Sequence, residues 1–134
     1  MLEDIFLPTV EMSKIREISP VALAFIGDAV HTMFVRARVI KGDIELLKNY
    51  HQKAASLCKA KSQAEVLNAL VPYLNADEQD IVRRARNAKL HHVAKNSDIE
   101  TYKKATSFEA LVGYLYLTGN FKRLNQILKN KENE

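Results

Sequence analysis

Signals that start and stop helices recur along this chain, and they constrain its fold more than any other feature. Ser19-Pro20 joins an N-cap residue to proline at the first helical position, so we expect a helix from there to about Ile40. No segment of useful length alternates apolar and polar residues, so strands are not supported. Further helices are predicted over residues 43–59, 62–73, 75–88, 97–117 and 120–128.

Particular side chains predict several of these helix starts. Asp43 is expected to cap the second helix. Ser62 and Glu65 have the spacing of a capping box, and Asn75 and Glu78 repeat that spacing at the next helix.

The sequence therefore predicts an all-α domain over residues 19–128. It lies between an N-terminal segment 1–18 of uncertain order and a charged tail over 129–134. Within the helix over 97–117, Thr106 is a point at which the helix can break. Gly119 is expected as the left-handed residue that ends this helix.

Composition restricts the class of protein. The chain has 134 residues, of which 47% are hydrophobic and 27% charged, as expected of one soluble globular domain. Its single cysteine, Cys58, excludes an intrachain disulfide framework and a multi-cysteine zinc site. Acidic Glu3 and Asp4 replace the basic start of a secretory signal, and no apolar run approaches membrane-spanning length. We expect a cytoplasmic protein without a membrane partner.

An aspartate lies in an apolar part of the first long helix. Asp28 competes for backbone hydrogen bonds there, and the neighbouring Gly27 costs about 1 kcal/mol relative to alanine. Two unfavourable choices side by side suggest a functional compromise. The alternative is an exposed aspartate at a helix edge, with Gly27 serving close helix packing. The core stripe expected on this helix consists of Ile26, Val30, Met33 and Ala37.

A glutamate lies in the most apolar helix of the chain. Glu109 is the only acid between Phe108 and Leu117, and Gly113 follows it on the same face, where it would let another helix or a ligand approach. A buried carboxylate needs a partner, a metal or water. The alternative here is a salt bridge to a lysine or arginine.

Asp28 and Glu109 together suggest a metal site. Two packed helices could bring these carboxylates to one Mg²⁺, which takes oxygen ligands and commonly uses one or two protein carboxylates plus substrate phosphates. Such an ion can activate water for attack on a phosphate. This reasoning makes a nuclease plausible without being specific to one.

A basic segment runs from Arg83 to Lys95 and contains no acid, in a chain with a net charge of +4. Salt-dependent contacts from such residues supply most of the affinity for a nucleic acid. The alternative is a solvated basic face. The RNA-binding candidates are Arg83, Arg84, Arg86, Asn87, Lys89 and Lys95.

The two carboxylates also lie in motifs that resemble those of the ribonuclease III family. The first motif is Leu23-Ala24-Phe25-Ile26-Gly27-Asp28-Ala29-Val30, and the second is Phe108-Glu109-Ala110-Leu111-Val112-Gly113-Tyr114-Leu115-Tyr116-Leu117. Segments 59–65, 84–89 and 101–106 resemble the short subclass called Mini-ribonuclease III, which lacks an appended double-stranded-RNA-binding domain.

The resemblance implies the all-α ribonuclease III endonuclease fold and a homodimer, with Phe25 at the position that inserts into the partner. It implies that Asp28 and Glu109 are the catalytic and metal-binding pair, with Mg²⁺ as cofactor and Mn²⁺ as an alternative. The implied activity is hydrolysis of double-stranded RNA to 5′-phosphate and 3′-hydroxyl ends. The implied substrate is the precursor of large-subunit (23S) ribosomal RNA, and a ribosomal protein helper is an open option.

Two family carboxylates are missing. Ala24 stands where the first motif has a glutamate, and Thr106 where the second has an aspartate. The short subclass shows a similarly reduced set, so activity is still expected, with the number of metal ions open. One alternative is a non-catalytic RNA-binding module with the same fold, and another is a helical DNA-binding or scaffold protein. No histidine is assigned a ligand role; His31 is either a residue behind the site or half exposed.

Overall fold

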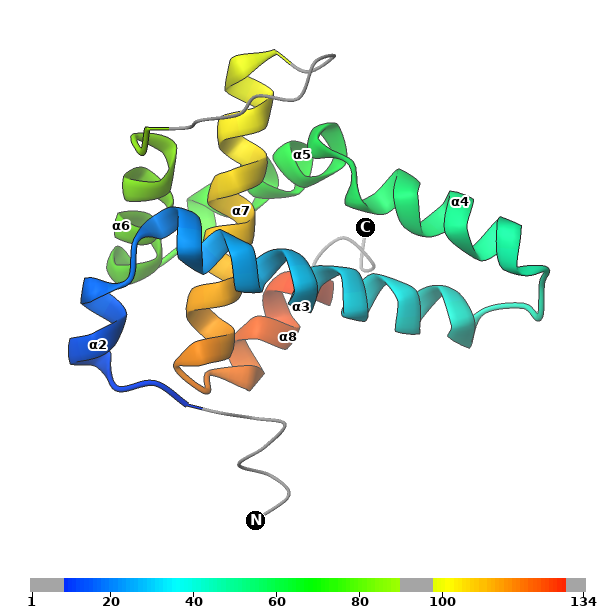
Figure 1. Cartoon of the computed structure of the whole chain (residues 1–134), viewed down its shortest axis with the longest axis horizontal. Coiled ribbons are helices and arrows are strands. Elements are labelled where there is room, and N and C mark those ends of the chain that lie inside the picture. Colours follow the sequence, from blue (N-terminus) through cyan, green and yellow to red (C-terminus); the bar gives the residue numbers. More distant parts are fainter. Residues whose placement is uncertain (1–8, 90–97, 130–134) are drawn as a thin grey trace.

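The protein is all-helical in the computed structural model, which describes residues 9–89 and 98–129 (Figure 1). No strand occurs in these residues, so the predicted all-α class is confirmed. In chain order the elements are α2 (Met12–Glu17), α3 (Pro20–Lys41), α4 (Leu47–Cys58), α5 (Ala60–Leu70), the 3-10 turn η1 (Val71–Tyr73), α6 (Ala76–Arg86), α7 (Ile99–Leu117) and α8 (Phe121–Lys129).

Helix α7 is the centre of the fold. Helices α3, α5, α6 and α8 all pack against it, and α3 crosses it (Figure 1). Consecutive residues from Ala105 to Leu115 on α7 are buried, Glu109 excepted, because neighbours cover the helix on all sides. Beyond the crossing, α3 and α4 extend to one side as a long hairpin.

Several helix ends follow the sequence signals. The Ser19 hydroxyl accepts a hydrogen bond from the Ala22 amide at 3.1 Å, which fixes the start of α3. Asn75 and Glu78 form the predicted capping box, with bonds of 2.9 and 3.0 Å. Gly119 has a φ of 74°, so its predicted left-handed conformation after α7 is confirmed.

Three local predictions are wrong. Helix α4 begins at Leu47 without a side-chain cap, so Asp43 does not cap it. Ser62 lies inside α5, which begins at Ala60, and its hydroxyl donates instead to the Ser56 carbonyl oxygen at 2.7 Å. Helix α7 is continuous through Thr106, because that residue is buried within the packed part of the helix.

The core face of α3 also differs from the prediction. Val30 is buried as expected, and Ile26 is half-buried, but Met33 and Ala37 are exposed. Helix α3 carries apolar residues on more than one face, and the face that α7 covers is not the one that the predicted stripe marks. The buried residues of α3 are Leu23, Ala24, Gly27, Val30, His31 and Val35.

Helix α3 is the one described helix that is long and apolar enough to cross a membrane, so the expectation of no such run does not hold by length and composition. Central helices of folded domains often meet the same criteria. Here α3 packs against α7 where the two helices cross, and it carries part of the pocket described next.

Candidate active site

The site is built where α3 and α7 touch. A Cβ atom at Gly27 would stand 1.7 Å from the Glu109 carbonyl oxygen, and one at Gly113 would stand 2.0 Å from the Leu23 carbonyl oxygen. Only glycine fits at either position, because the two backbones are in contact. This crossing brings Asp28, the residue after Gly27, next to Glu109.

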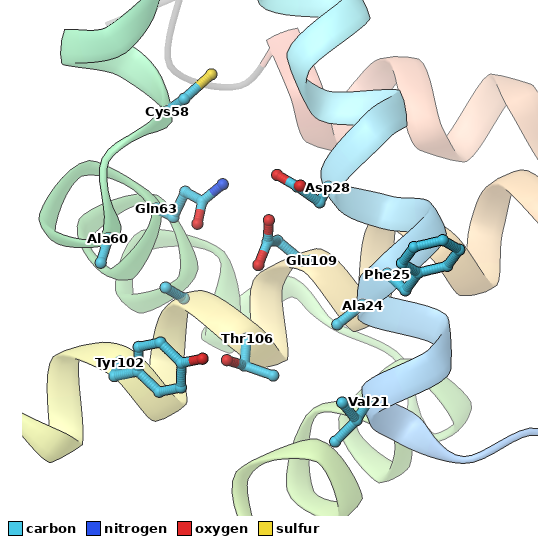
Figure 2. A pocket seen from close by; sticks show the side chains of 11 residues that line it. Val21, Ala24, Phe25, Asp28, Cys58, Ala60, Gln63, Tyr102, Thr106 and Glu109 are labelled. Carbon is cyan, nitrogen blue, oxygen red and sulfur yellow. The ribbon is translucent and has the colours of Figure 1, made fainter. Parts of the chain in front are cut away.

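A pocket of about 450 Å³ opens at this crossing. Asp28 and Glu109 both line it, and Figure 2 shows their carboxyl groups pointing toward one another from α3 and α7. Glu109 is half-buried and Asp28 is exposed to the pocket. The structure thus brings together the two carboxylates that the sequence singled out. The other lining residues are Val21, Ala24, Phe25, Cys58, Ala60, Gln63, Tyr102, Ala105 and Thr106.

The electrostatics of the pocket favour a bound cation. Burial first, and then the neighbouring Asp28 carboxyl, raise the pKa of Glu109 from 4.5 to about 8, although a hydrogen bond from Gln63 partly opposes the shift. Two carboxyls this close resist being charged together, and a divalent cation removes that repulsion.

The donor set fits a hard, partly hydrated cation. Among the described residues no group of three or more His, Cys, Asp or Glu side chains is placed to hold a metal. Two carboxylates in an open pocket leave room for water and substrate oxygens, which is the arrangement Mg²⁺ commonly uses.

The two positions that lack a carboxylate also line the pocket. Ala24 on α3 and Thr106 on α7 stand near Asp28 and Glu109 (Figure 2). All four positions at which the ribonuclease III motifs have a carboxylate thus line the pocket, and two of them, Asp28 and Glu109, carry one in this chain. Cys58 lines it from the end of α4, and burial raises the pKa of its thiol.

Sequence reasoning missed Gln63, which lines the same pocket from α5 although it is 4% exposed. Its Nε2 lies 3.1 Å from Nδ1 of His31. His31 is buried, and burial lowers its pKa to about 4, with Asp28 opposing, so the ring is neutral near pH 7. The sequence did contain a signal for Gln63, because it is a polar residue at a helical position that the fold buries.

The predicted basic residues lie on and just after α6, outside the pocket. Arg83 pairs with Asp80 at 2.5 Å, Arg86 pairs with Glu100 at 2.9 Å, and Arg84 is half-buried. Asn87 and Lys89 are exposed, while Lys95, like His91 and His92, lies outside the described residues. The Arg86–Glu100 pair joins the end of α6 to the first turn of α7.

Phe25 is the most exposed of the pocket residues that the sequence singled out. It follows Ala24 on α3, and 82% of its surface is accessible. Met33, two turns along the same helix, is 64% exposed. A large aromatic ring and a methionine side chain are therefore both exposed along α3.

Comparison with known proteins gives consistent matches. The profile of the ribonuclease III domain matches residues 21–120. The Mini-ribonuclease 3 of Symbiobacterium thermophilum is 44% identical over 110 residues, which span 82% of this chain and 85% of that protein. The Mini-ribonuclease 3 of Streptococcus pneumoniae is 37% identical over 119 residues, spanning 87% and 93%.

A solved structure shares the fold. The crystal structure of a Fusobacterium nucleatum protein matches with a TM-score of 0.80 at 24% identity, covering 89% of this chain and 95% of that one. At this identity the likeness concerns the fold alone.

Proposed function

The chain belongs to the ribonuclease III family of endoribonucleases, and we propose that it cleaves double-stranded RNA with Mg²⁺ at the pocket between α3 and α7. The observation that carries the proposal is the convergence of the Asp28 and Glu109 carboxyls in one pocket. These two residues are the proposed catalytic and metal-binding pair.

Asp28 and Glu109 would hold the cation, with Mn²⁺ as an alternative to Mg²⁺. When bound, the ion supplies positive charge to the phosphate under attack and favours deprotonation of the attacking water. The protein's own contribution is to keep both carboxylates fixed and close. Glu109 must give up its proton before it can serve as a ligand, because its pKa is raised to about 8.

The reduced carboxylate set shapes the affinity for metal. With Ala24 and Thr106 in the pocket, two protein carboxylates are available to hold the ion, so the remaining ligands would have to come from water and from phosphate oxygens of bound RNA. Mg²⁺ should therefore bind weakly to the free protein and more tightly once RNA is present.

The basic residues at the end of α6 and just after it are the proposed RNA contact. The Arg86–Glu100 pair joins the end of α6 to the first turn of α7, and Tyr102 on that same end of α7 lines the pocket. The exposed ion pairs of Arg83 and Arg86 are each worth about 0–1 kcal/mol, so phosphates can compete for these cations. Lys95 remains a candidate from the sequence.

The proposal includes a homodimer formed through α3. The exposed Phe25 and Met33 on one side of this helix support it, because a second copy could cover them while leaving the pocket facing the RNA. A dimer would also present two pockets to the two strands of one duplex.

The physiological substrate is part of the proposal. The Mini-ribonuclease 3 relatives support a short ribonuclease. We propose that it acts in the cytoplasm on the precursor of large-subunit ribosomal RNA. A ribosomal protein helper stays an open option within it.

The test is cleavage of a structured duplex RNA in Mg²⁺. We expect cuts that leave 5′-phosphate and 3′-hydroxyl ends, loss of cutting with EDTA, and weaker cutting as salt rises. A single-stranded RNA of the same composition should be largely spared. Binding of the duplex without any cleavage would instead favour the non-catalytic RNA-binding module.

A further inference from the structure

Gln63 is a buried polar side chain to which the proposed chemistry gives no role. It lies on α5 at 4% exposure and extends into the pocket, facing Asp28 and Glu109 (Figure 2). A buried primary amide is costly unless its N–H and carbonyl groups find partners. Its burial therefore calls for specific contacts.

The side-chain amide of Gln63 has two partners. Nε2 lies 3.1 Å from Nδ1 of His31, and Gln63 also hydrogen-bonds to Glu109. That second bond favours the charged form of the carboxyl, as expected when an N–H donates to it. One NH₂ group has two hydrogens, so it can serve both partners.

His31 fixes the orientation of this amide. Because the ring is neutral and its Nδ1 accepts from Gln63, its own hydrogen is on Nε2. The ring stands edge-on against Phe108, with centroids 5.0 Å apart and planes at 82°. Phe108 directly precedes Glu109, and His31 is three residues after Asp28. The contacts thus link α5 to both carboxylate-bearing helices.

We infer that Gln63, held in place by His31, is a positioning residue that orients the Glu109 carboxylate toward a divalent cation. The inference rests on the proposed metal-dependent function. Hydrogen-bonding partners behind a metal ligand typically change metal affinity or activity by about 10–100-fold when they are removed. A merely structural pair would change stability and leave metal affinity alone.

The experiment measures Mn²⁺ binding to the RNA-free protein by calorimetry, and kcat and KM on duplex RNA. Gln63→Met keeps the length of the side chain without its donors. We expect Mn²⁺ binding weaker by roughly 10-fold or more, a lower kcat partly rescued by excess Mn²⁺, and an unchanged KM for RNA. His31→Phe keeps the ring against Phe108 and should act in the same direction but less strongly. The double variant should be no worse than Gln63→Met alone, since the two residues act as one unit.

Leu67→Ala is the matched control. Leu67 is buried on the same helix, about one turn beyond Gln63 and outside the pocket lining. Its truncation should lower thermal stability and leave Mn²⁺ affinity unchanged.

The inference is overturned if folded Gln63→Met binds Mn²⁺ and turns over RNA within twofold of wild type. If that variant does not fold, unchanged Mn²⁺ affinity in His31→Phe overturns it. A wild-type protein that binds Mn²⁺ but leaves RNA intact contradicts the proposed function alone. A wild-type protein that binds no Mn²⁺ and also leaves duplex RNA intact contradicts both.

Discussion

The backbone at Gly27 lies against the backbone of Glu109, so that a Cβ at Gly27 would stand 1.7 Å from the Glu109 carbonyl oxygen. This contact between two helices sets the distance between the two carboxylates, because Asp28 follows Gly27 directly. A glycine that is unfavourable for an isolated helix is therefore required for the site.

Gly27→Ala should destabilise the fold and the site together. The added Cβ meets backbone, which cannot rotate away, so α3 must move off α7 at a cost of about 1–3 kcal/mol or more. Thermal unfolding measures the loss. Gly42→Ala is the control, because its Cβ would meet no atom closer than 3.4 Å. An unchanged melting temperature for Gly27→Ala would argue against the close crossing.

Metal binding to the free protein should depend on pH. With its pKa at about 8, Glu109 is protonated at neutral pH and must release that proton to bind an ion. Affinity for Mn²⁺ should rise by up to about tenfold per pH unit between pH 6 and 8, then level off. Glu109→Gln should remove this pH dependence of Mn²⁺ affinity. An affinity that does not change with pH in the wild type would contradict the protonation of Glu109 at neutral pH.

The same shift affects stability without metal. Glu109 is protonated in the folded chain up to a pH of about 8 but would lose its proton near 4.5 when unfolded. Its contribution to stability is therefore fully present below pH 4.5 and is lost as the pH rises toward 8. Saturating Mn²⁺ should offset this loss in thermal unfolding at pH 8. No such recovery is expected for Glu109→Gln.

Arg123→Leu should be strongly destabilising. The Arg123 guanidinium donates two bonds of 2.8 Å to the Glu78 carboxylate, whose side chain is 1% exposed. Removing the arginine leaves a buried charge unpaired, at a cost of about 3–5 kcal/mol. Urea unfolding at pH 7 measures this cost. Arg83→Leu, which breaks an exposed pair, should stay within about 1 kcal/mol.

The effect of Arg123→Leu should shrink in acid. Burial raises the pKa of Glu78, but hydrogen bonds from Arg123 and from the Asn75 amide outweigh burial and leave the pKa lowered. Stability from this group is thus present above its ordinary pKa of 4.5 and is lost as the pH falls through the lowered value. A constant difference between variant and wild type down to low pH would contradict the ion-pair account.

Phe25→Asp should dissociate the proposed dimer. Sedimentation should give a dimeric mass for the wild type and a monomeric mass for the variant, because a charge at a buried apolar contact is costly. Tyr73→Asp is a suitable control, since Tyr73 is also a large exposed ring, at 74%, but lies away from α3 on η1. A monomeric wild type, or a dimer that tolerates Phe25→Asp, would contradict an interface at Phe25.

The carboxylates and the crossing glycines were predictable, because each breaks a local preference within an apolar helix. Asp28, Glu109, Gly27 and Gly113 all stand out for that reason, and the structure brings them to one place. Their catalytic role came from resemblance to a family, since polarity alone also allows a buried salt bridge.

Other features depend on tertiary packing and leave no local signal. Gln63 and His31 are 32 residues apart, and nothing in the local sequence around either residue predicts the contact between them. The predicted core face of α3 was wrong because this helix has apolar residues on more than one side, and which side is buried depends on where α7 packs. Ser62 was mistaken for a cap because α4 and α5 meet with only Lys59 between them, so α5 begins before Ser62.

The most direct test of the account is the single-turnover rate at which Asp28→Asn cuts duplex RNA in saturating Mg²⁺. The loss of one of two carboxylates should lower the rate on the order of 1,000-fold, while duplex binding stays within threefold of wild type. Asp77→Asn, which alters an exposed aspartate on α6, should cut as wild type does. A wild type that does not cut, or an Asp28→Asn protein that cuts at the wild-type rate, would contradict the account.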